Sequence, residues 1–339
     1  MAKLWTDVID PATLTGFARA EQAEYEAAKG SLARWLPNQE VADVSVRFMA
    51  GSAGLVPEAR YRAFDAEPEF GSGPQGERVT IDLVALSQQG LISERDQLRL
   101  RSADDETRQR ILMGATRSAV RAIVDRAERM RGTVLVTGKA TIAQDNYADE
   151  TDYGRDASMT VTAGTLWSAA GADPIGYLTT LQDQYVALNG VEPGAIVMSR
   201  RVLRALGSNA KLAVQLLNGQ SRPATESDVR NTVSGAGLPE ITLYDRRTKS
   251  GRILPDDTLL LLPEPVDPVG GESELGATFW GQSLAASEPD WQIEEAEQPG
   301  IVAAAFTNQG IPPIKHTYAD SLNLPVLANA NLSLAAKVL

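Results

Sequence analysis

DDETRQRILMGATRSAVRAIVDRAERMRG, residues 104–132, is the most strongly helical stretch of the sequence. Acids open it and arginines close it before Gly132, which suits the two ends of the helix dipole and predicts the end of the helix. Apolar residues recur every three or four positions along one face, at Leu112, Ala115, Ala119, Ile123, Ala127 and Met130. A helix over 104–131 would be about 42 Å long. Because this is too long for the core of a compact domain, we expect a spine that lies across a sheet.

The residues before the spine predict an arm followed by a hairpin. A helix is expected from Thr13 to Lys29, where Gly30 ends it, and a strand from Val41 to Phe48. Strands at 60–64 and 78–84 then flank a polar tip at 67–76 that is rich in Pro and Gly. A two-stranded ribbon of this length is marginal in water, so we expect a neighbouring molecule to hold it.

The residues after the spine predict a short strand at 133–137 and then an α/β region over 165–285. Within that region helices are expected at 173–188, 200–206, 211–217 and 226–233, and strands at 195–198, 241–245 and 258–262. Strands at 301–306 and 325–334 close the chain. Because strands flank both the spine and the C-terminal part, the α/β region is interpreted as an insert within an outer α+β domain.

Composition excludes several classes of protein. Among 339 residues, 44 acids against 32 Lys and Arg give a net charge of −12, which argues against a general nucleic-acid binder. The absence of cysteine excludes disulfides, thiolate metal sites and Cys nucleophiles. The N-terminus reaches Asp7 before any apolar run, which predicts no secretory signal. No apolar run approaches the roughly 20 residues of a membrane span.

The residues that could perform catalysis are few. The single histidine, His316, cannot build a triad or a multi-histidine metal site, and we interpret it as structural. The acid clusters at 104–106, 256–257 and 294–295 are interpreted as a helix start, a turn and a solvated stretch. A carboxylate-dependent α/β enzyme remains an alternative, and it requires two acids that converge in a pocket of the 165–285 region. No catalytic residue, cofactor or metal ligand is predicted.

The order of these parts, together with four short motifs, resembles a known fold. The motifs are Phe64-Asp65, Asp96 to Leu100, Gly251 to Thr258 (GRILPDDT) and Thr278 to Gly281 (TFWG). The chain resembles the Hong Kong 97-type fold of tailed-phage major capsid proteins, and specifically the lambda-like major capsid protein E family. The resemblance covers nearly the whole chain and rests on the order of the motifs.

The resemblance implies a division of the chain into named parts. Residues 1–46 would be an N-terminal arm and 47–85 the extended loop. A P-domain would take 86–164, including the spine helix, and 286–339 as closing strands. The α/β insert, 165–285, would be the A-domain at the capsomer centre.

The resemblance also implies a non-enzymatic function. The chain would be the major capsid protein of a tailed phage, assembled in the host bacterial cytoplasm into hexamers and pentamers of an icosahedral head that encloses double-stranded DNA. Its partners would be copies of itself, a portal, a decoration protein and a separate scaffolding protein, since only 46 residues precede the hairpin. The DNA would make at most weak contacts with arginines, and no membrane is involved. No lysine occurs between Lys29 and Lys139, so the lysine cross-link of some relatives cannot start from this loop.

Six residues are candidates for contacts between subunits. They lie on the hairpin and on the outward face of the spine: Arg60, Arg62, Phe64, Arg78, Arg117 and Arg121. Nucleic-acid binding is the alternative role for the spine arginines, although interleaved acids favour a solvated face. An encapsulin-type nanocompartment shell of the same fold is the main alternative function.

Overall fold

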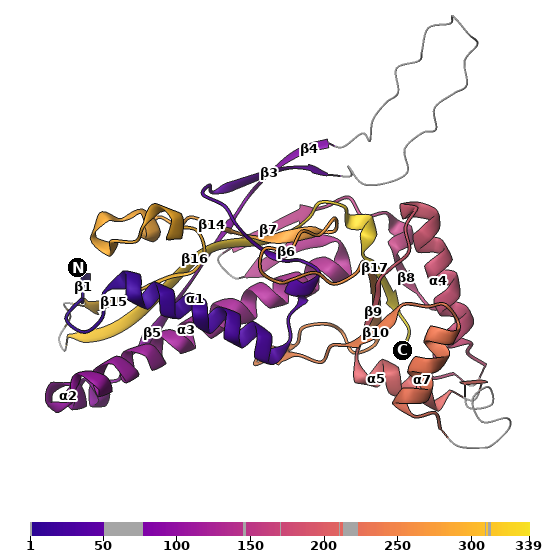
Figure 1. Cartoon of the computed structure of the whole chain (residues 1–339), viewed down its shortest axis with the longest axis horizontal. Helices are drawn as coiled ribbons and strands as arrows, with labels where there is room; N and C mark the ends of the chain where they lie inside the picture. The colour runs from indigo at the N-terminus through magenta and orange to yellow at the C-terminus, as the bar shows by residue number, and fades with distance from the viewer. Residues whose placement is uncertain are drawn as a thin grey trace, which may run out of the picture.

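The computed structural model describes residues 2–50, 77–144, 147–169, 171–209, 211–212, 223–308, 310 and 313–339. The molecule is elongated, with the long helix α3 and a six-stranded sheet toward one end and a five-stranded sheet with its helices at the other (Figure 1). The α-helices of the described residues are α1 (Pro11–Lys29), α2 (Glu94–Ser102), α3 (Asp105–Thr137), α4 (Pro174–Asn189), α5 (Arg200–Ser208) and α7 (Glu226–Gly235).

The spine helix begins where the sequence predicts but ends later. Asp104 is its N-cap and accepts the Thr107 N–H at 3.0 Å. The predicted end at Gly132 is wrong, and residues 133–137 are helical rather than a strand. Gly132 permits close packing instead, because a Cβ there would lie 2.7 Å from Cγ2 of Ile253. The helix ends at Gly138, whose φ of 73° is the left-handed conformation that glycine adopts readily.

Arg155 satisfies the carbonyl groups at the end of the spine. Its guanidinium donates to the Leu135 oxygen at 2.8 Å and also to the Val136 oxygen. These carbonyls lie in the last turn, where the helix leaves acceptors unpaired. Burial lowers the pKa of Arg155 to about 10. A side chain 18 residues after Thr137 therefore fixes where α3 stops.

The six-stranded sheet is built around one long strand. β16 pairs antiparallel with β15, β14 and β5, and α3 packs against it. The short strands β1 and β2 add to β15 and β14. The strands are β1 (Ala2–Leu4), β2 (Asn38–Glu40), β5 (Val84–Leu91), β14 (Gly276–Gly281), β15 (Val302–Asn308) and β16 (Ile314–Leu327).

The five-stranded sheet has the order β10-β9-β13-β17-β8. Its strands are β8 (Thr160–Thr162), β9 (Ala195–Met198), β10 (Glu240–Leu243), β13 (Thr258–Leu262) and β17 (Leu334–Lys337). The predicted strands at 195–198, 241–245 and 258–262 are confirmed within a residue or two. The pairing nevertheless crosses the predicted limits at 165 and 285, because β8 and β17 join this sheet while β14 joins the other. The division into an A-domain and a P-domain stays a prediction.

A ribbon of β3 (Ser45–Ala50) and β4 (Glu77–Asp82) projects from the body (Figure 1). The predicted strand at 78–84 is confirmed as β4, and its partner among the described residues is β3; the predicted strand at 60–64 lies outside them. Val46 and Ile81 face each other in register and are buried in the main core. They anchor the base of the ribbon.

Two smaller hairpins complete the strands. β6 (Lys139–Gln144) pairs with β7 (Tyr147–Asp152), and β11 (Arg247–Thr248) pairs with β12 (Gly251–Arg252).

The predicted helix before Gly30 is confirmed as α1, and Gly30 has a φ of 74°. The predicted helix at 211–217 lies almost wholly outside the described residues. His316 pairs with Phe306 across β15 and β16 and stacks on its ring at 5.9 Å, as a structural histidine does.

A buried charged network joins the arm, the spine and both sheets. Arg131 of α3 is fully buried and donates to Glu26 of α1 at 2.7 Å, to Glu128 one turn earlier at 2.8 Å, and to Thr278 of β14 at 2.8 Å. Its remaining nitrogen donates to Asn38 of β2. The guanidinium is therefore compensated by groups from four elements.

Glu128 is the second centre of this network. Its carboxylate accepts hydrogen bonds from Ser31 at 2.8 Å, from the Leu32 N–H at 2.8 Å and from the Tyr244 hydroxyl at 2.6 Å. Burial alone would raise the pKa of Glu128, but the guanidinium groups of Arg131 and Arg246 outweigh it and hold that pKa below its ordinary value. Tyr244 follows β10, so the five-stranded sheet is tied to the same charge.

Replacing Arg131 by Met should destabilise the protein strongly. The substitution leaves Glu26 and Glu128 buried without their cation, which costs about 3–5 kcal/mol. Urea denaturation of the unassembled protein followed by circular dichroism measures the change. Arg99→Met is a matched control, because Arg99 also pairs with an acid three residues earlier, Asp96, but is exposed; that variant should keep nearly the original stability. Equal midpoints for the two variants would contradict the role given to Arg131.

Candidate assembly surfaces

Two of the predicted contact residues hold the arm against the spine of the same chain. Arg117 and Arg121 each direct Nε to Glu21 of α1 at 2.7 Å, and they lie over the rings of Phe17 and Tyr25. The Glu21 side chain is only 3% exposed, whereas the arginines are 46% and 47% exposed. Each guanidinium therefore keeps an outward face while it pairs with α1. Their predicted contact with a neighbouring subunit stays a prediction.

The Glu21 carboxylate is held ionised by this arrangement. Burial alone would raise the pKa of Glu21, but the hydrogen bonds and charges of Arg117 and Arg121 outweigh it, and the pKa lies below its ordinary value. The residues that α1 buries include Leu14, Thr15 and Ala18, which form a narrow face with little apolar area. This ion pair is therefore a principal polar tie to α3. The sequence alone did not indicate it, since Glu21 lies 96 residues before Arg117.

The other predicted contact residues belong to the ribbon. Arg60, Arg62 and Phe64 lie outside the described residues. Arg78 lies on β4, opposite Met49 of β3. Of these four predicted residues, Arg78 alone is therefore placed, on a different element from the spine pair.

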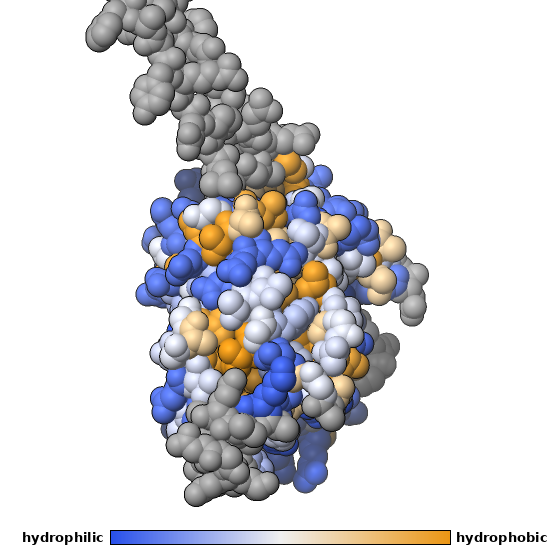
Figure 2. Space-filling model, turned by 90° about the vertical axis from the view of Figure 1, so that its right-hand side faces the viewer, coloured by the Kyte–Doolittle hydropathy of each residue, from blue (hydrophilic) through white to orange (hydrophobic). Residues whose placement is uncertain are grey.

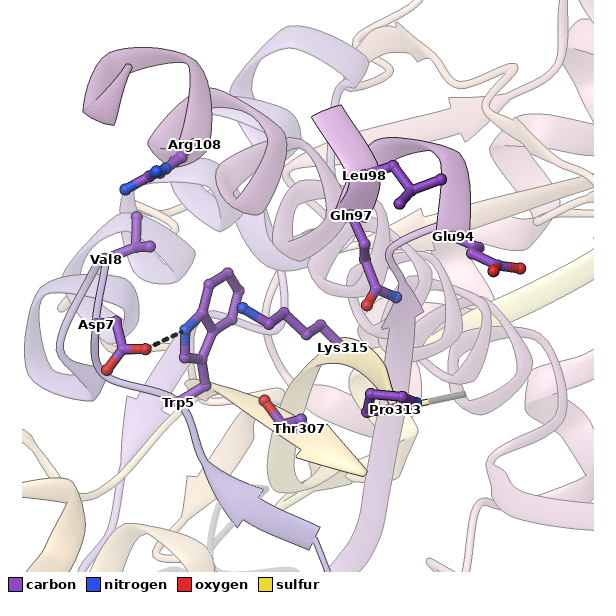
Figure 3. Close-up of a pocket in the computed structure, with 10 residues that line it drawn as sticks. All are labelled: Trp5, Asp7, Val8, Glu94, Gln97, Leu98, Arg108, Thr307, Pro313 and Lys315. Carbon is purple, nitrogen blue, oxygen red and sulfur yellow. Dashed lines mark hydrogen bonds between the residues drawn. The ribbon is translucent and has the colours of Figure 1, made fainter. Parts of the chain in front are cut away.

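A recess of about 380 Å³ opens at the end of the molecule formed by β1, α2 and the tips of β15 and β16 (Figure 3). The Trp5 indole donates to Asp7 at 3.1 Å, and the Lys315 ammonium lies 3.4 Å from the centre of its ring. Burial lowers the pKa of Lys315. The recess carboxylates of Asp7 and Glu94 lie on opposite sides of the opening, so no acid pair converges there (Figure 3). This geometry suits packing rather than catalysis.

The ends of the molecule differ in what they expose. Leu91 at the end of β5 is 71% exposed, and Leu98 on α2, which lines this recess, is 55% exposed. The opposite end, with α4 and α7, shows hydrophobic residues in several separate groups among hydrophilic ones (Figure 2).

The acids that an enzyme would need are engaged in ion pairs. Asp256 and Asp257 lie on the predicted turn, where Asp256 pairs with Arg201 at 3.0 Å and Asp257 with Lys337 at 3.2 Å. In the part of the chain that the structure describes, no group of three His, Asp or Glu could hold a metal ion. No helix among those same residues is long and apolar enough to cross a membrane.

Comparison with known proteins gives one family. The family model described as phage major capsid protein E matches residues 38–278. A search of proteins with curated descriptions found no match.

Solved structures share the fold at low sequence identity. A prophage protein of Escherichia coli CFT073, assigned as a capsid protein, has a TM-score of 0.60 and 18% identity, with 100% of both chains covered. A phage-related protein from Bordetella bronchiseptica RB50 has a TM-score of 0.60 and 14% identity over 95% of this chain and 96% of its own. A virus-like particle protein from Pyrococcus furiosus has a TM-score of 0.52 and 9% identity over 95% and 98%.

Replacing Glu21 by Gln should weaken the docking of α1 and reduce its dependence on pH. Because the folded-state pKa of Glu21 lies below its unfolded value, the ion pair stabilises the fold above about pH 4.3 and is lost as the pH falls through the folded-state pKa. We expect a loss of about 1–2 kcal/mol at pH 7, since both arginines are half exposed. Urea titrations at pH 7 and pH 3 measure it.

The matched control for that prediction is Glu24→Gln on the exposed side of α1. It should leave stability at pH 7 nearly unchanged. If Glu21→Gln behaved like this control at pH 7, the ion pair with Arg117 and Arg121 would not dock α1.

Proposed function

The chain belongs to the phage major capsid protein E family, and from this membership we propose that it builds the closed icosahedral head of a tailed phage from hexamers and pentamers. The family and the shared fold give the chain a structural role in a phage capsid. The finer statements below are part of the proposal.

The observation that carries the proposal is the projecting ribbon. Its base is anchored in the core through the buried pair Val46 and Ile81, while β3 and β4 continue away from the body (Figure 1). A two-stranded ribbon is marginal by itself, and contact with another copy would stabilise it. A subunit that completes itself on its neighbours is suited to a closed lattice.

The proposed shell is held without covalent cross-links from the extended loop. A lysine in that loop would be needed for an isopeptide bond, and the sequence has none between Lys29 and Lys139. The proposal therefore relies on non-covalent contacts, including the exposed faces of Arg117 and Arg121 and the residues Arg60, Arg62, Phe64 and Arg78 of the ribbon.

The proposed partners follow from the family. They are copies of the chain, a separate scaffolding protein, a portal and a decoration protein, with assembly in the cytoplasm of the bacterial host and the virion as the final location. Packaged DNA would be confined by the shell rather than gripped, in keeping with the net charge of −12. The proposed role includes no enzymatic activity.

Co-expression with the scaffolding protein of the same phage tests the proposal. We expect closed particles of uniform size by electron microscopy and sedimentation. Subunits from these particles should migrate as single chains on a denaturing gel without reducing agent, because neither a disulfide nor a loop lysine is available. Strictly monomeric protein in the presence of the scaffold would overturn the proposed function, whereas ladders of covalent oligomers would overturn only the claim about cross-links.

A further inference from the structure

Charged side chains alone line a shallow recess beside the N-terminus of α5. Its volume is about 410 Å³, and it lies between α5 and the β11–β12 hairpin. The lining residues are five arginines and two aspartates: Arg200, Arg201, Arg204, Arg247, Arg252, Asp245 and Asp256. Three positive charges are thus in excess here, although the chain as a whole carries a charge of −12. Guanidinium groups held this close repel each other unless anions lie between them.

The acids of the recess are already used. Asp245 accepts the Arg200 N–H at 3.2 Å and pairs with Arg252, and Asp256 pairs with Arg201. By contrast, Arg204 and Arg247 are exposed, and neither side chain forms an ion pair with any described residue. Nε of Arg252 is buried without an acceptor among the described residues. The recess therefore offers donors for anionic groups that this chain does not supply at that place.

The complementary charge lies on another part of the molecule. Five acids occur between residues 288 and 297 without any basic residue, and all five are exposed: Glu288, Asp290, Glu294, Glu295 and Glu297. In the described structure none of them forms an ion pair. Trp291 and Ile293 are buried in a cluster with Val302 and Ala304 of β15, so the acidic segment is held firmly on the sheet.

The recess and the acidic segment cannot meet within one chain. The segment follows β14 and packs on β15, toward the end that carries the N-terminus, whereas α5 lies toward the opposite end (Figure 1). A contact between these two different surfaces on two copies is heterologous, and such contacts close into rings when the rotation permits. Charge complementarity of this kind sets the orientation of a partner more than its affinity.

We propose that the arginine recess of one copy binds the acidic segment 288–297 of a second copy. The carboxylates of that segment would accept from the exposed guanidinium groups of Arg204 and Arg247. Planar guanidinium groups match carboxylates in two-point hydrogen bonds. This inference rests on the proposed function, since it specifies one of the contacts by which the subunits assemble.

Charge reversal on each surface tests the pairing. Arg204→Glu with Arg247→Glu should abolish particle formation with the scaffolding protein, and so should Glu294→Arg with Glu295→Arg, because each variant then opposes like charges. A single chain that carries all four substitutions should restore particles, since each reversed surface then meets its complement on the next copy in hexamers and pentamers alike. Sedimentation and electron microscopy measure the yield. The replaced side chains make no ion pair with any residue that the structure describes, so both variants are expected to fold, which circular dichroism verifies.

Lys29→Glu with Arg95→Glu is the matched control, because it removes the same charge from exposed residues outside the recess. It should assemble like the unaltered protein. Normal particles from either reversed variant, or no gain from combining both reversals in one chain, would overturn the inference while the proposed function stands. Unaltered protein that forms no particles would instead overturn the proposed function. If the first variant assembled normally but lost binding of duplex DNA, the recess would be a nucleic-acid site and the inference would be wrong.

A cross-linking measurement gives independent evidence. The chain has no cysteine, so Arg204→Cys with Glu294→Cys introduces the only two thiols. A short bismaleimide should join assembled subunits into covalent oligomers, while a single Arg204→Cys variant should give none beyond dimers. Absence of oligomers from the assembled double variant would contradict the contact.

Discussion

The buried guanidinium of Arg131 constrains the whole molecule, because the groups that compensate its charge come from separate segments. Glu26 belongs to the arm, Glu128 to the spine, Asn38 to an edge strand and Thr278 to the central sheet. Moving any of these segments away would leave a charge in a dry environment without its partner, at a cost of several kcal/mol. The network thus selects one relative position of arm, spine and sheets. Tyr244, which donates to Glu128, extends the same constraint to the five-stranded sheet.

The arm is consequently part of the body. α1 has few large apolar residues. It packs on the spine of its own chain through Glu21 and Glu26, and on β15 through its buried face. The ribbon of β3 and β4 is different, since Val46 and Ile81, the buried residues among those whose burial is described, lie at its base.

Local patterns predict α1, α3, α4, α5 and α7 because their signals lie within a few residues, whereas α2 is not predicted. Asp104 and Gly30 act as caps, and the apolar period of the spine is visible in the sequence. The predicted end of the spine is wrong because Gly132 makes room for Ile253, 121 residues later, instead of ending the helix. In addition, Arg155 caps the helix from outside it. The sequence also does not predict that β14 joins the six-stranded sheet and β17 the five-stranded sheet. The pairing of these strands depends on residues that are distant in the chain. Likewise Arg117 and Arg121 looked solvated because Glu21, their partner, is distant in the chain. The excess charge at Arg204 and Arg247 cannot be predicted from the sequence, because the recess exists only once α5 and the β11–β12 hairpin come together.

The junction between the ribbon and the central sheet has a mechanical consequence. A single residue, Leu83, separates β4 from β5, and its N–H donates to the Val44 oxygen at 2.8 Å. Gly281 of β14 leaves room for it, because a Cβ there would lie 2.6 Å from Cδ1 of Leu83. β5 then runs antiparallel to β16 from Val84 to Leu91. Because Leu83 alone separates the two strands, little of a tilt of the ribbon can be absorbed there, and the rest passes into the twist of β5 and β16. The angle of the ribbon and the curvature of the sheet beneath it are therefore coupled.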